Sequence, residues 1–375
     1  MDRLEVRVSI TKVLLCLIVV IVPLSVVGLI LTQNSDKALD NSIGNNFRTM
    51  AQIYSNEVSE FMLDRVHDVM AMSADPVIIQ AVSNANRSGG NKRPSNAVVE
   101  KATSKVATGA VQAATSSSLQ SNSAAQVLRL RRDLDPRFLR IVATDENGTV
   151  VAATYQPSAA SYAQNEVWQA AFNKGQGAIK IADILYDEFT KAYYVTIGVP
   201  ISGSSGTAPI GVMSAAVNIT SLLSRFQQSQ LGNGARAMLV KDDGSVVSGP
   251  SADVFARVPS QEFNAIRDSI GSLEGTQAGW AMPELRTGPY IVGYANTGLK
   301  KNYDNLGWFV VVSQEEHQAS APIRQLEHFA IAMVILGLLM VILLGVYYYL
   351  HRTQKYAHLT GDEFAETHGG RTATA

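Results

Sequence analysis

The residue types that most often carry catalysis or bind metals are sparse in the long central part of this chain. His67 and His317 lie there, with His328 at its edge, and none has the spacing of metal ligands or an H-E-x-x-H motif. The stretch Gly203-Ser-Ser-Gly206 lacks the G-x-S-x-G pattern of a nucleophile elbow. We therefore expect no catalytic residues, no bound metal, no cofactor and no enzymatic role.

Aromatic and polar side chains between residues 162 and 218 are better suited to recognition. A small-molecule pocket needs rigid aromatic walls and a few polar groups that fix the ligand's orientation. The candidate walls and polar groups are Tyr162, Glu166, Trp168, Tyr186, Asp187 and Asn218. The alternative is structural, with Trp168 as an ordinary core residue and Asp187 as a turn residue. The residues alone leave both interpretations open.

Two uncharged apolar segments, residues 13–31 and 329–350, enclose the region that holds these candidates. At about 1.5 Å per residue, each is long enough to cross a hydrocarbon core of roughly 30 Å. A cleaved signal peptide is the alternative for the first segment. That run is long for a signal peptide, and residues 33–36 offer no small-residue cleavage site. We therefore predict two membrane-spanning helices.

Basic residues flank both predicted spans on the same side of the membrane. Arg3, Arg7 and Lys12 precede the first span, and Arg352 and Lys355 follow the second. Such residues favour the cytoplasm. We expect a two-pass protein of the bacterial plasma (inner) membrane, with both termini cytoplasmic and the main domain periplasmic or extracellular.

Cys16 is the only cysteine, so the main domain has no disulfide. A net charge of −1 argues against a nucleic-acid partner.

The elements that must position the candidate residues follow from periodicity. Apolar residues at helical spacing, beginning Phe47, Met50, Tyr54 and Val58, predict one helix from the membrane to about residue 82. Further helices are expected at 166–173 and 218–228, and Asn147-Gly148 predicts a tight hairpin turn. Strands are expected at residues 138–143, 149–153, 179–185, 193–199, 210–217 and 308–313.

Two short motifs recur with the same offset. Asp145-Glu-Asn-Gly148-Thr-Val-Val is followed 96 residues later by Lys241-Asp-Asp-Gly244-Ser-Val-Val. Tyr194-Val-Thr-Ile is followed at the same offset by Tyr290-Ile-Val-Gly. The shared offset predicts two copies of one α+β module, each an antiparallel sheet with flanking helices.

Several of these segments, in this order, resemble the double Cache sensor domains of bacterial chemoreceptors and sensor histidine kinases. The resemblance covers nearly all of residues 10–350. It rests on the membrane-emergent helix and on the segments Phe138–Ala153, Val167-Trp168-Gln-Ala-Ala, Ile184-Leu-Tyr186-Asp187, Thr196-Ile-Gly-Val-Pro200-Ile, Ile210-Gly-Val-Met-Ser-Ala-Ala-Val-Asn218-Ile and Leu306-Gly-Trp308-Phe-Val-Val-Val-Ser-Gln314. It implies a long membrane-emergent helix and two stacked PAS-like antiparallel-sheet modules between two transmembrane helices.

The resemblance also implies a small-molecule pocket in the membrane-distal module, and it strengthens the candidacy of Trp168 and Asp187. Family members that bind amino acids resemble one another in an arginine two residues before the tryptophan and an aspartate late in the module. Here those positions hold Glu166 and Asn218, so bidentate recognition of a ligand carboxylate is lost there. We expect a ligand other than an ordinary amino acid, either neutral or a cation that uses Glu166 or Asp187.

The expected organisation is a cytoplasmic segment 1–12, a span 13–31, an extracytoplasmic domain 33–327, a span 329–350 and a short tail 351–375. Within the domain we expect a membrane-distal module at about 83–228 and a membrane-proximal module at about 229–315. The predicted function is that of a sensor, which signals through its transmembrane helices to a separate membrane or cytoplasmic partner, and the resemblance implies a homodimer. The alternatives are a non-catalytic membrane scaffold and a truncated chemoreceptor relic.

Overall fold

The computed structural model describes residues 10–89, 119, 121–203, 208–229, 231, 234–250, 252–267, 270, 278–320, 332, 335–340, 342–343 and 345–347, with side chains from residue 38 onward. The chain divides into a unit of residues 44–315 and a unit formed by the two flanking segments. The unit of residues 44–315 contains all of the sheet structure that is described.

Helix α1 (Ile10–Ser73) forms the support for this unit from residue 44 onward. Its buried stripe includes Phe47, Ala51, Val58 and Met62, at the spacing of one helix face. The helix ends earlier than predicted, because Asp75-Pro76 interrupts it and α2 (Pro76–Gly89) begins at the proline. Proline lacks the amide hydrogen that a continuous helix needs, yet it fits the first turn of a new one.

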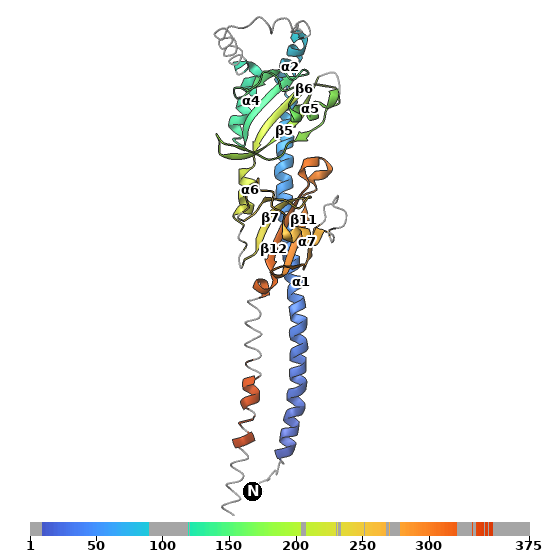
Figure 1. The fold of residues 1–375 in the computed structure, drawn as a ribbon, viewed down its shortest axis with the longest axis vertical. Helices are drawn as coiled ribbons and strands as arrows, with labels where there is room; N and C mark the ends of the chain where they lie inside the picture. Colours follow the sequence, from blue (N-terminus) through green and yellow to red (C-terminus); the bar gives the residue numbers. More distant parts are fainter. Residues whose placement is uncertain are drawn as a thin grey trace, which may run out of the picture. The chain divides into compact units, whose positions relative to one another are not determined.

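The first module is built on a six-stranded antiparallel sheet in the order β2-β1-β6-β5-β3, with β4 also paired to β5. The strands are β1 (Phe138–Asp145), β2 (Val150–Ala153), β3 (Lys180–Ile181), β4 (Leu185–Asp187), β5 (Ala192–Ser202) and β6 (Pro209–Asn218). Helices α2 and α4 (Ser123–Leu134) pack on β1, while α5 (Glu166–Phe172) packs on β5 and β6 (Figure 1). A short 3₁₀ turn (Asn173–Gly175) follows α5.

The second module repeats this arrangement, with sheet order β10-β11-β12-β7-β8 and β9 paired to β11. Its strands are β7 (Arg236–Lys241), β8 (Val246–Ser248), β9 (Ala278–Ala281), β10 (Glu284–Leu285), β11 (Gly288–Asn296) and β12 (Trp308–Glu315). Helix α6 (Thr220–Gln227) connects the modules, α7 (Gln261–Ile266) follows the first hairpin, and 3₁₀ turns lie at Leu299–Lys301 and Asp304–Leu306. The strand order matches that of the first module, which confirms the prediction of two antiparallel-sheet modules and a long N-terminal helix.

The hairpin turns at the two predicted repeats have the same construction. Gly148 and Gly244 adopt φ values of 76° and 90°, which favour glycine. The amide of Gly148 donates to the carbonyl of Asp145, and the amide of Gly244 donates to that of Lys241. The glycine carbonyls then accept from residues 162 and 260, just before α5 and α7. Each turn thus fixes the approach of its helix to the sheet.

Helix α1 lies directly against the second sheet at Gly293 of β11. A Cβ atom there would lie 2.3 Å from the backbone carbon of Phe47, so any larger residue would push the helix away. Further along α1, Ser59 donates a hydrogen bond to the carbonyl of Thr297, and Arg65 pairs with Asp135 after α4. Successive parts of α1 therefore contact first the second module and then the first.

One sequence prediction needs correction, and several lie wholly or partly outside the described residues. The strand predicted at 179–185 is instead divided into β3 and β4, which pair with different parts of β5. Residues 90–118 and 120, near the start of the predicted membrane-distal module, are not described. The predicted first span falls in the part of α1 without described side chains, and the tail 351–375 and part of 329–350 are not described. Within the described residues, no helix combines the length and hydropathy needed to cross a membrane.

Candidate ligand-binding site

The first module contains a cavity of about 120 Å³ on the sheet face that α5 partly covers. Strands β1, β5 and β6 form its floor, and the connection between β2 and α5 forms its wall. Its lining residues are Arg140, Val142, Tyr155, Tyr162, Asn165, Tyr194, Thr196, Ser214 and Ala216. The cavity therefore combines one guanidinium group, three phenols and two aliphatic hydroxyl groups.

Strand alternation explains why these side chains meet. Residues two apart in a strand face the same side, so Arg140 and Val142 share a face on β1, as do Tyr194 and Thr196 on β5. In the register of the sheet, Val142 lies opposite Ser214, and Thr196 lies opposite Ala216. The small side chains on β6 leave room between the flanking strands, and this room becomes the cavity.

The guanidinium of Arg140 is the charged group of the cavity. Its central carbon lies 5.9 Å from the ring centroid of Tyr155 and 5.0 Å from that of Tyr194. One of its nitrogens is 3.3 Å from a carboxylate oxygen of Asp187 on β4. Stacking on aromatic faces and pairing with a carboxylate both hold the arginine over the cavity.

The phenols of Tyr155 and Tyr162 are joined by a hydrogen bond of 2.6 Å between their oxygens. Burial raises the pKa of the Tyr155 phenol well above its ordinary value, and the hydrogen bond to Tyr162 raises it further. Tyr155 is therefore protonated at physiological pH. The pair offers the cavity one hydroxyl donor and additional acceptor capacity.

Of the candidates predicted from the sequence, Tyr162 lines the cavity and Trp168 lies behind it. Trp168 is buried, stacks on Phe172 with ring centroids 4.9 Å apart, and donates from its indole nitrogen to Thr144 at 2.9 Å. Both Trp168 and Tyr162 pack in the same small cluster with Val212. The tryptophan therefore supports the cavity wall through its contact with Tyr162.

The remaining candidates are spread around the module. Asp187 reaches the cavity through its ion pair with Arg140, while its other oxygen accepts from the amides of residues 189 and 190. Tyr186 faces Tyr193, 5.0 Å away, and Glu166 is exposed on the first turn of α5. Asn218 accepts from the amide of residue 220, where α6 begins. None of these four is among the lining residues of the cavity.

Sequence reasoning missed Arg140, Tyr155 and Tyr194 as lining residues. A signal for Arg140 was present, because it is a charged residue inside an otherwise apolar strand, Phe-Leu-Arg-Ile-Val-Ala. A charge at such a position needs a partner or water. Tyr194 belongs to the repeated motif Tyr194-Val-Thr-Ile, which was interpreted only as evidence of duplication.

The corresponding space in the second module is filled. Position for position, 96 residues later, Val142 corresponds to Met238 and Thr196 to Val292. The sheet register pairs Met238 with Val311, where Val142 pairs with Ser214. These larger apolar residues pack with Phe263 and Phe309 in a buried cluster. Among the described residues, a polar cavity lies on the sheet face of the first module, where the second module has packed apolar side chains.

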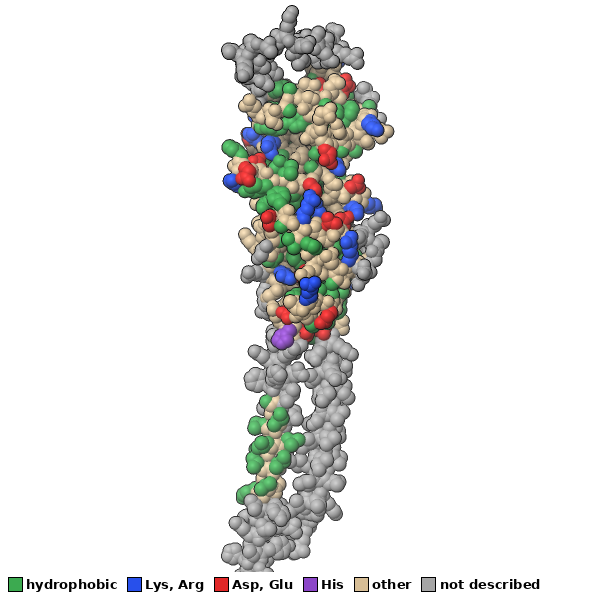
Figure 2. Space-filling model, in the orientation of Figure 1, with side chains coloured by type: hydrophobic (Ala, Val, Ile, Leu, Met, Phe, Trp, Pro, Cys, Tyr) green, Lys and Arg blue, Asp and Glu red, His purple; other side chains and the backbone are tan. Residues whose placement is uncertain are grey.

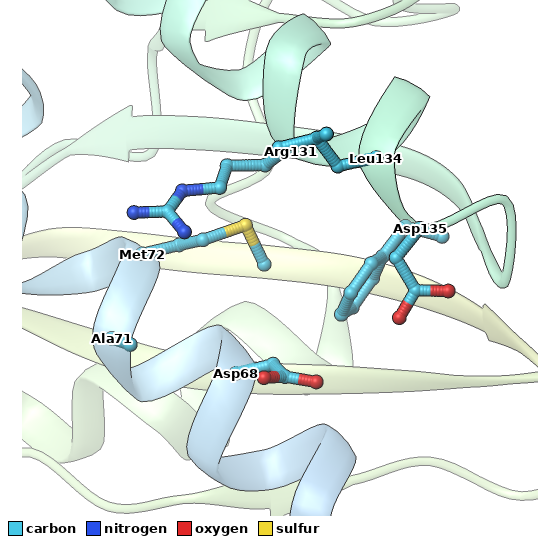
Figure 3. A pocket seen from close by; sticks show the side chains of 7 residues that line it. Asp68, Ala71, Met72, Arg131, Leu134 and Asp135 are labelled. Carbon is cyan, nitrogen blue, oxygen red and sulfur yellow. The ribbon is translucent and has the colours of Figure 1, made fainter.

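A second cleft, of about 130 Å³, lies between α1 and the end of α4. Figure 3 shows Asp68 and Met72 on α1 facing Arg131, Leu134 and Asp135. Burial alone would raise the pKa of the Asp135 carboxyl, but hydrogen bonds from Arg137 and the charges of Arg137 and Arg65 bring it below its ordinary value. The acidic group already has ionic partners, which suits a structural role at the helix junction.

On the face shown in Figure 2, acidic and basic side chains are intermixed over the unit of residues 44–315. No extended basic surface is visible on that face. The net charge of −1 is consistent with this pattern.

Several solved structures are similar to this chain at low sequence identity, and one of those described here reaches a TM-score of 0.50. The sensory domain of chemoreceptor Tlp3 of Campylobacter jejuni is 12% identical, with a TM-score of 0.50, covering 76% of this chain and 98% of that one. The ligand-binding domain of the amino-acid chemoreceptor PctC of Pseudomonas aeruginosa PAO1, in complex with GABA, is 13% identical with a TM-score of 0.46. The match covers 73% of this chain and 100% of that one. The ligand-binding domain of chemoreceptor CtaA of Pseudomonas fluorescens, in complex with L-leucine, is 13% identical with a TM-score of 0.45, and the match covers 76% of this chain and 97% of that one.

No curated protein sequence matches the chain significantly. The sequence profile of one family, dCache_1 (Cache domain), matches residues 35–323, which includes both sheet modules. This match covers most of the chain. Together with the repeated module and the long N-terminal helix, it shows that the chain belongs to the Cache-domain family, whose members are extracytoplasmic, non-catalytic sensor domains of membrane receptors.

Proposed function

We propose that this protein is a membrane-anchored sensor whose first module binds a small molecule in the Arg140 cavity. The observation that carries the proposal is the difference between equivalent positions of the two modules. The first keeps hydroxyl groups and a guanidinium around an open space, whereas the second fills that space with apolar side chains. Polar groups around a cavity on a rigid sheet are suited to orienting a ligand.

Relatives with this fold bind small molecules: the solved structures include PctC with GABA and CtaA with L-leucine. Glu166 and Asn218 stand where family members that bind amino acids have an arginine and an aspartate, and neither residue lines the cavity of this chain. Recognition here is therefore assigned to the cavity residues, with Arg140 as the charged group. This assignment replaces the expectation of a cation held by Glu166 or Asp187.

The proposal includes two membrane spans, at residues 13–31 and 329–350, with the modules outside the cytoplasm of a bacterial inner membrane. Apolar side chains that are described in the second segment, including Leu336, Met340 and Tyr347, are exposed at 63%, 66% and 68% (Figure 2). Lipid would cover such side chains. The full chain should stay in the membrane pellet after carbonate extraction, and its release into the supernatant would contradict the two-span arrangement.

In this arrangement the first module, held by the later part of α1, is membrane-distal and the second is membrane-proximal. Ligand binding acts on signalling only through different affinities for two conformations. Helix α1 contacts both modules and continues toward the first span, so it is the element we assign to transmission. A homodimer is part of the proposal, because Leu130 and Leu134 on α4 are 61% and 71% exposed.

The test of the cavity assignment is thermal unfolding of the full-length chain in detergent against a panel of neutral, cationic and anionic metabolites. A ligand at about 100 times its dissociation constant stabilises the native state by about 2.7 kcal/mol. Ser214→Leu blocks the cavity, and Ser221→Leu on the exposed face of α6 is the matched control. We expect a stabilising compound that acts on the wild type and the control but not on Ser214→Leu. A folded protein that responds to nothing would contradict the proposal.

A further inference from the structure

We propose that the ligand of the first module carries a carboxylate, and that this carboxylate displaces Asp187 from Arg140. The inference rests on the proposed function, since it assigns a ligand class to the same cavity. It assigns Arg140 as the specificity residue and Asp187 as an internal counter-ion that occupies Arg140 while the ligand is absent.

The first argument is the charge of the cavity. Arg140 is the one charged residue among those that line it. The hydroxyl groups of Tyr155, Tyr162, Thr196 and Ser214 add hydrogen-bond donors around the same space. A guanidinium supported by hydroxyl donors is complementary to a planar anion with several acceptor sites, which is the chemistry of a carboxylate.

The second argument is an internal comparison between two arginines at the same position of the repeat. Arg140 on β1 corresponds to Arg236 on β7, 96 residues later. In the second module, the buried carboxylate of Glu262 on α7 pairs with Arg236. Glu262 lies two residues after the N-cap Ser260, and the residue two after the N-cap Asn165 of α5 is Val167. The first module thus has no carboxylate at the helix position that neutralises Arg236 in the second module, and the carboxylate that α5 does carry, Glu166, is one residue earlier and exposed.

The third argument is the weakness of the substitute contact. The Asp187 oxygen lies 3.3 Å from the Arg140 nitrogen, and the side chains of Arg140 and Asp187 are 37% and 12% exposed. Because the guanidinium keeps its contact with solvent, this ion pair contributes less than a fully buried one, and a ligand that reaches Arg140 can replace it. The other oxygen of Asp187 accepts hydrogen bonds from the amides of residues 189 and 190. Asp187 therefore stays in place in this turn when Arg140 pairs with a ligand.

The aromatic lining does not favour a cationic ligand. The guanidinium of Arg140 lies over the rings of Tyr155 and Tyr194, whose faces would otherwise attract a ligand cation. A cation in the cavity would also meet the charge of Arg140 at short range. Both effects select against amines and for anions.

The experiment is isothermal titration calorimetry of the full-length chain in detergent. The probes are propionate, butyrate and benzoate, each compared with its own neutral amide, which has nearly the same shape. We expect at least one carboxylate to bind, and its amide to bind more weakly by about tenfold or more, because the charge-assisted bonds are lost. Arg140→Gln should remove carboxylate binding, whereas Arg140→Lys should keep part of it.

Asp187→Asn provides the second, independent test. Asparagine keeps an oxygen for the amides of residues 189 and 190 but removes the charge that competes for Arg140. We expect carboxylates to bind about two- to fivefold more tightly to this variant. Asp183→Asn is the matched control, because Asp183 pairs with Lys241 instead of Arg140, and it should leave the affinity unchanged.

Several outcomes would overturn the inference. These are failure of all three carboxylates to bind, equal binding of carboxylates and amides, retention of affinity in Arg140→Gln, and unchanged or weaker binding in Asp187→Asn. If the ligand from the wider metabolite panel is neutral or cationic and binds Arg140→Gln normally, the inference fails while the sensor function stands. If no compound of either panel binds, the proposed function fails as well.

Discussion

The two modules share a strand order and a hairpin turn but differ in what lies between the sheet and the short helix. In the first, small and polar residues such as Ser214 and Thr196 leave a cavity under Arg140. In the second, Met238, Val292 and Val311 occupy the equivalent positions and pack against Phe263. The comparison teaches that one fold can leave a polar cavity or pack it closed, according to a few side chains on three strands, and under our proposal the first module binds the ligand while the second supports it.

The largest expected effect is on the packed core of the second module. Phe263 is fully buried, and its ring lies 5.1 Å from that of Phe309. Phe263→Ala should lower the free energy of unfolding by about 3–5 kcal/mol, since it leaves a cavity in a dense cluster. Urea denaturation of the full-length chain measures this loss. Phe189→Ala, at a side chain 96% exposed, is the control and should change it by less than about 0.5 kcal/mol.

A reciprocal exchange at one sheet position should show that the two modules tolerate different residues. Val311→Ser places a hydroxyl in the buried cluster of the second module and should cost about 2–3 kcal/mol of unfolding free energy. Ser214→Val adds apolar volume next to the cavity and should change stability by less than about 1 kcal/mol. Equal costs for the two variants would show that the cavity is packed as tightly as the core.

The two arginines should differ in how much they depend on their carboxylates. Glu262→Gln removes a buried charge partner of Arg236 and should lower the unfolding free energy by about 1–3 kcal/mol. Asp187→Asn should lower it by less than about 1 kcal/mol, because Arg140 keeps contact with solvent and two tyrosine rings. Chemical denaturation of both variants decides this, and a larger loss for Asp187→Asn would refute the view of Asp187 as a displaceable counter-ion.

The smallest effect concerns acid stability at the equivalent turns. Burial by itself would raise the pKa of the Asp243 carboxyl, but hydrogen bonds from Ser245 lower it overall. A carboxyl whose pKa is lower when folded stabilises the protein above its unfolded pKa, and this contribution disappears as pH falls through the folded value. Asn147 occupies the equivalent place in the first turn.

The variant that tests this pKa is Asp243→Asn, which gives the second hairpin turn the asparagine that the first turn has at position 147. It should cost less than about 0.5 kcal/mol at pH 7, because the group is exposed and screened. The difference from the wild type should shrink as pH falls below about 4. Urea denaturation at pH 7 and pH 3 measures it, and a difference that grows in acid would contradict the lowered pKa.

The fold could be predicted from local signals wherever those signals agree with tertiary packing. Asn147-Gly148 predicted the first hairpin, and the 96-residue offset predicted the second module. The long helix was predicted past its true end, because periodicity continued through Pro76 although proline cannot continue a helix interior. The strand at 179–185 was predicted as one segment because its apolar residues do not show where its pairing with β5 shifts.

The site was harder to predict because a cavity forms where side chains from several strands leave space unfilled. Trp168 has the residue type of a pocket wall, yet its ring stacks on Phe172 behind Tyr162. Arg140 is a charged residue within an apolar strand. Its importance follows only from the small residues opposite it on β6 and from Val167 on α5, which stands where the second module has the carboxylate of Glu262. Such relations join residues far apart in sequence, and no local pattern encodes them.

The most direct test of the central claim converts the first module toward the second. In the double variant Thr196→Val and Ser214→Val, both aliphatic hydroxyl groups of the cavity are replaced by the residues of the second module. Calorimetric titration of the best-binding compound into the full-length wild type and this variant is the measurement. We expect binding to be lost while the variant unfolds at the same or a higher denaturant concentration. Undiminished affinity in the folded variant would contradict the assignment of this cavity as the ligand site.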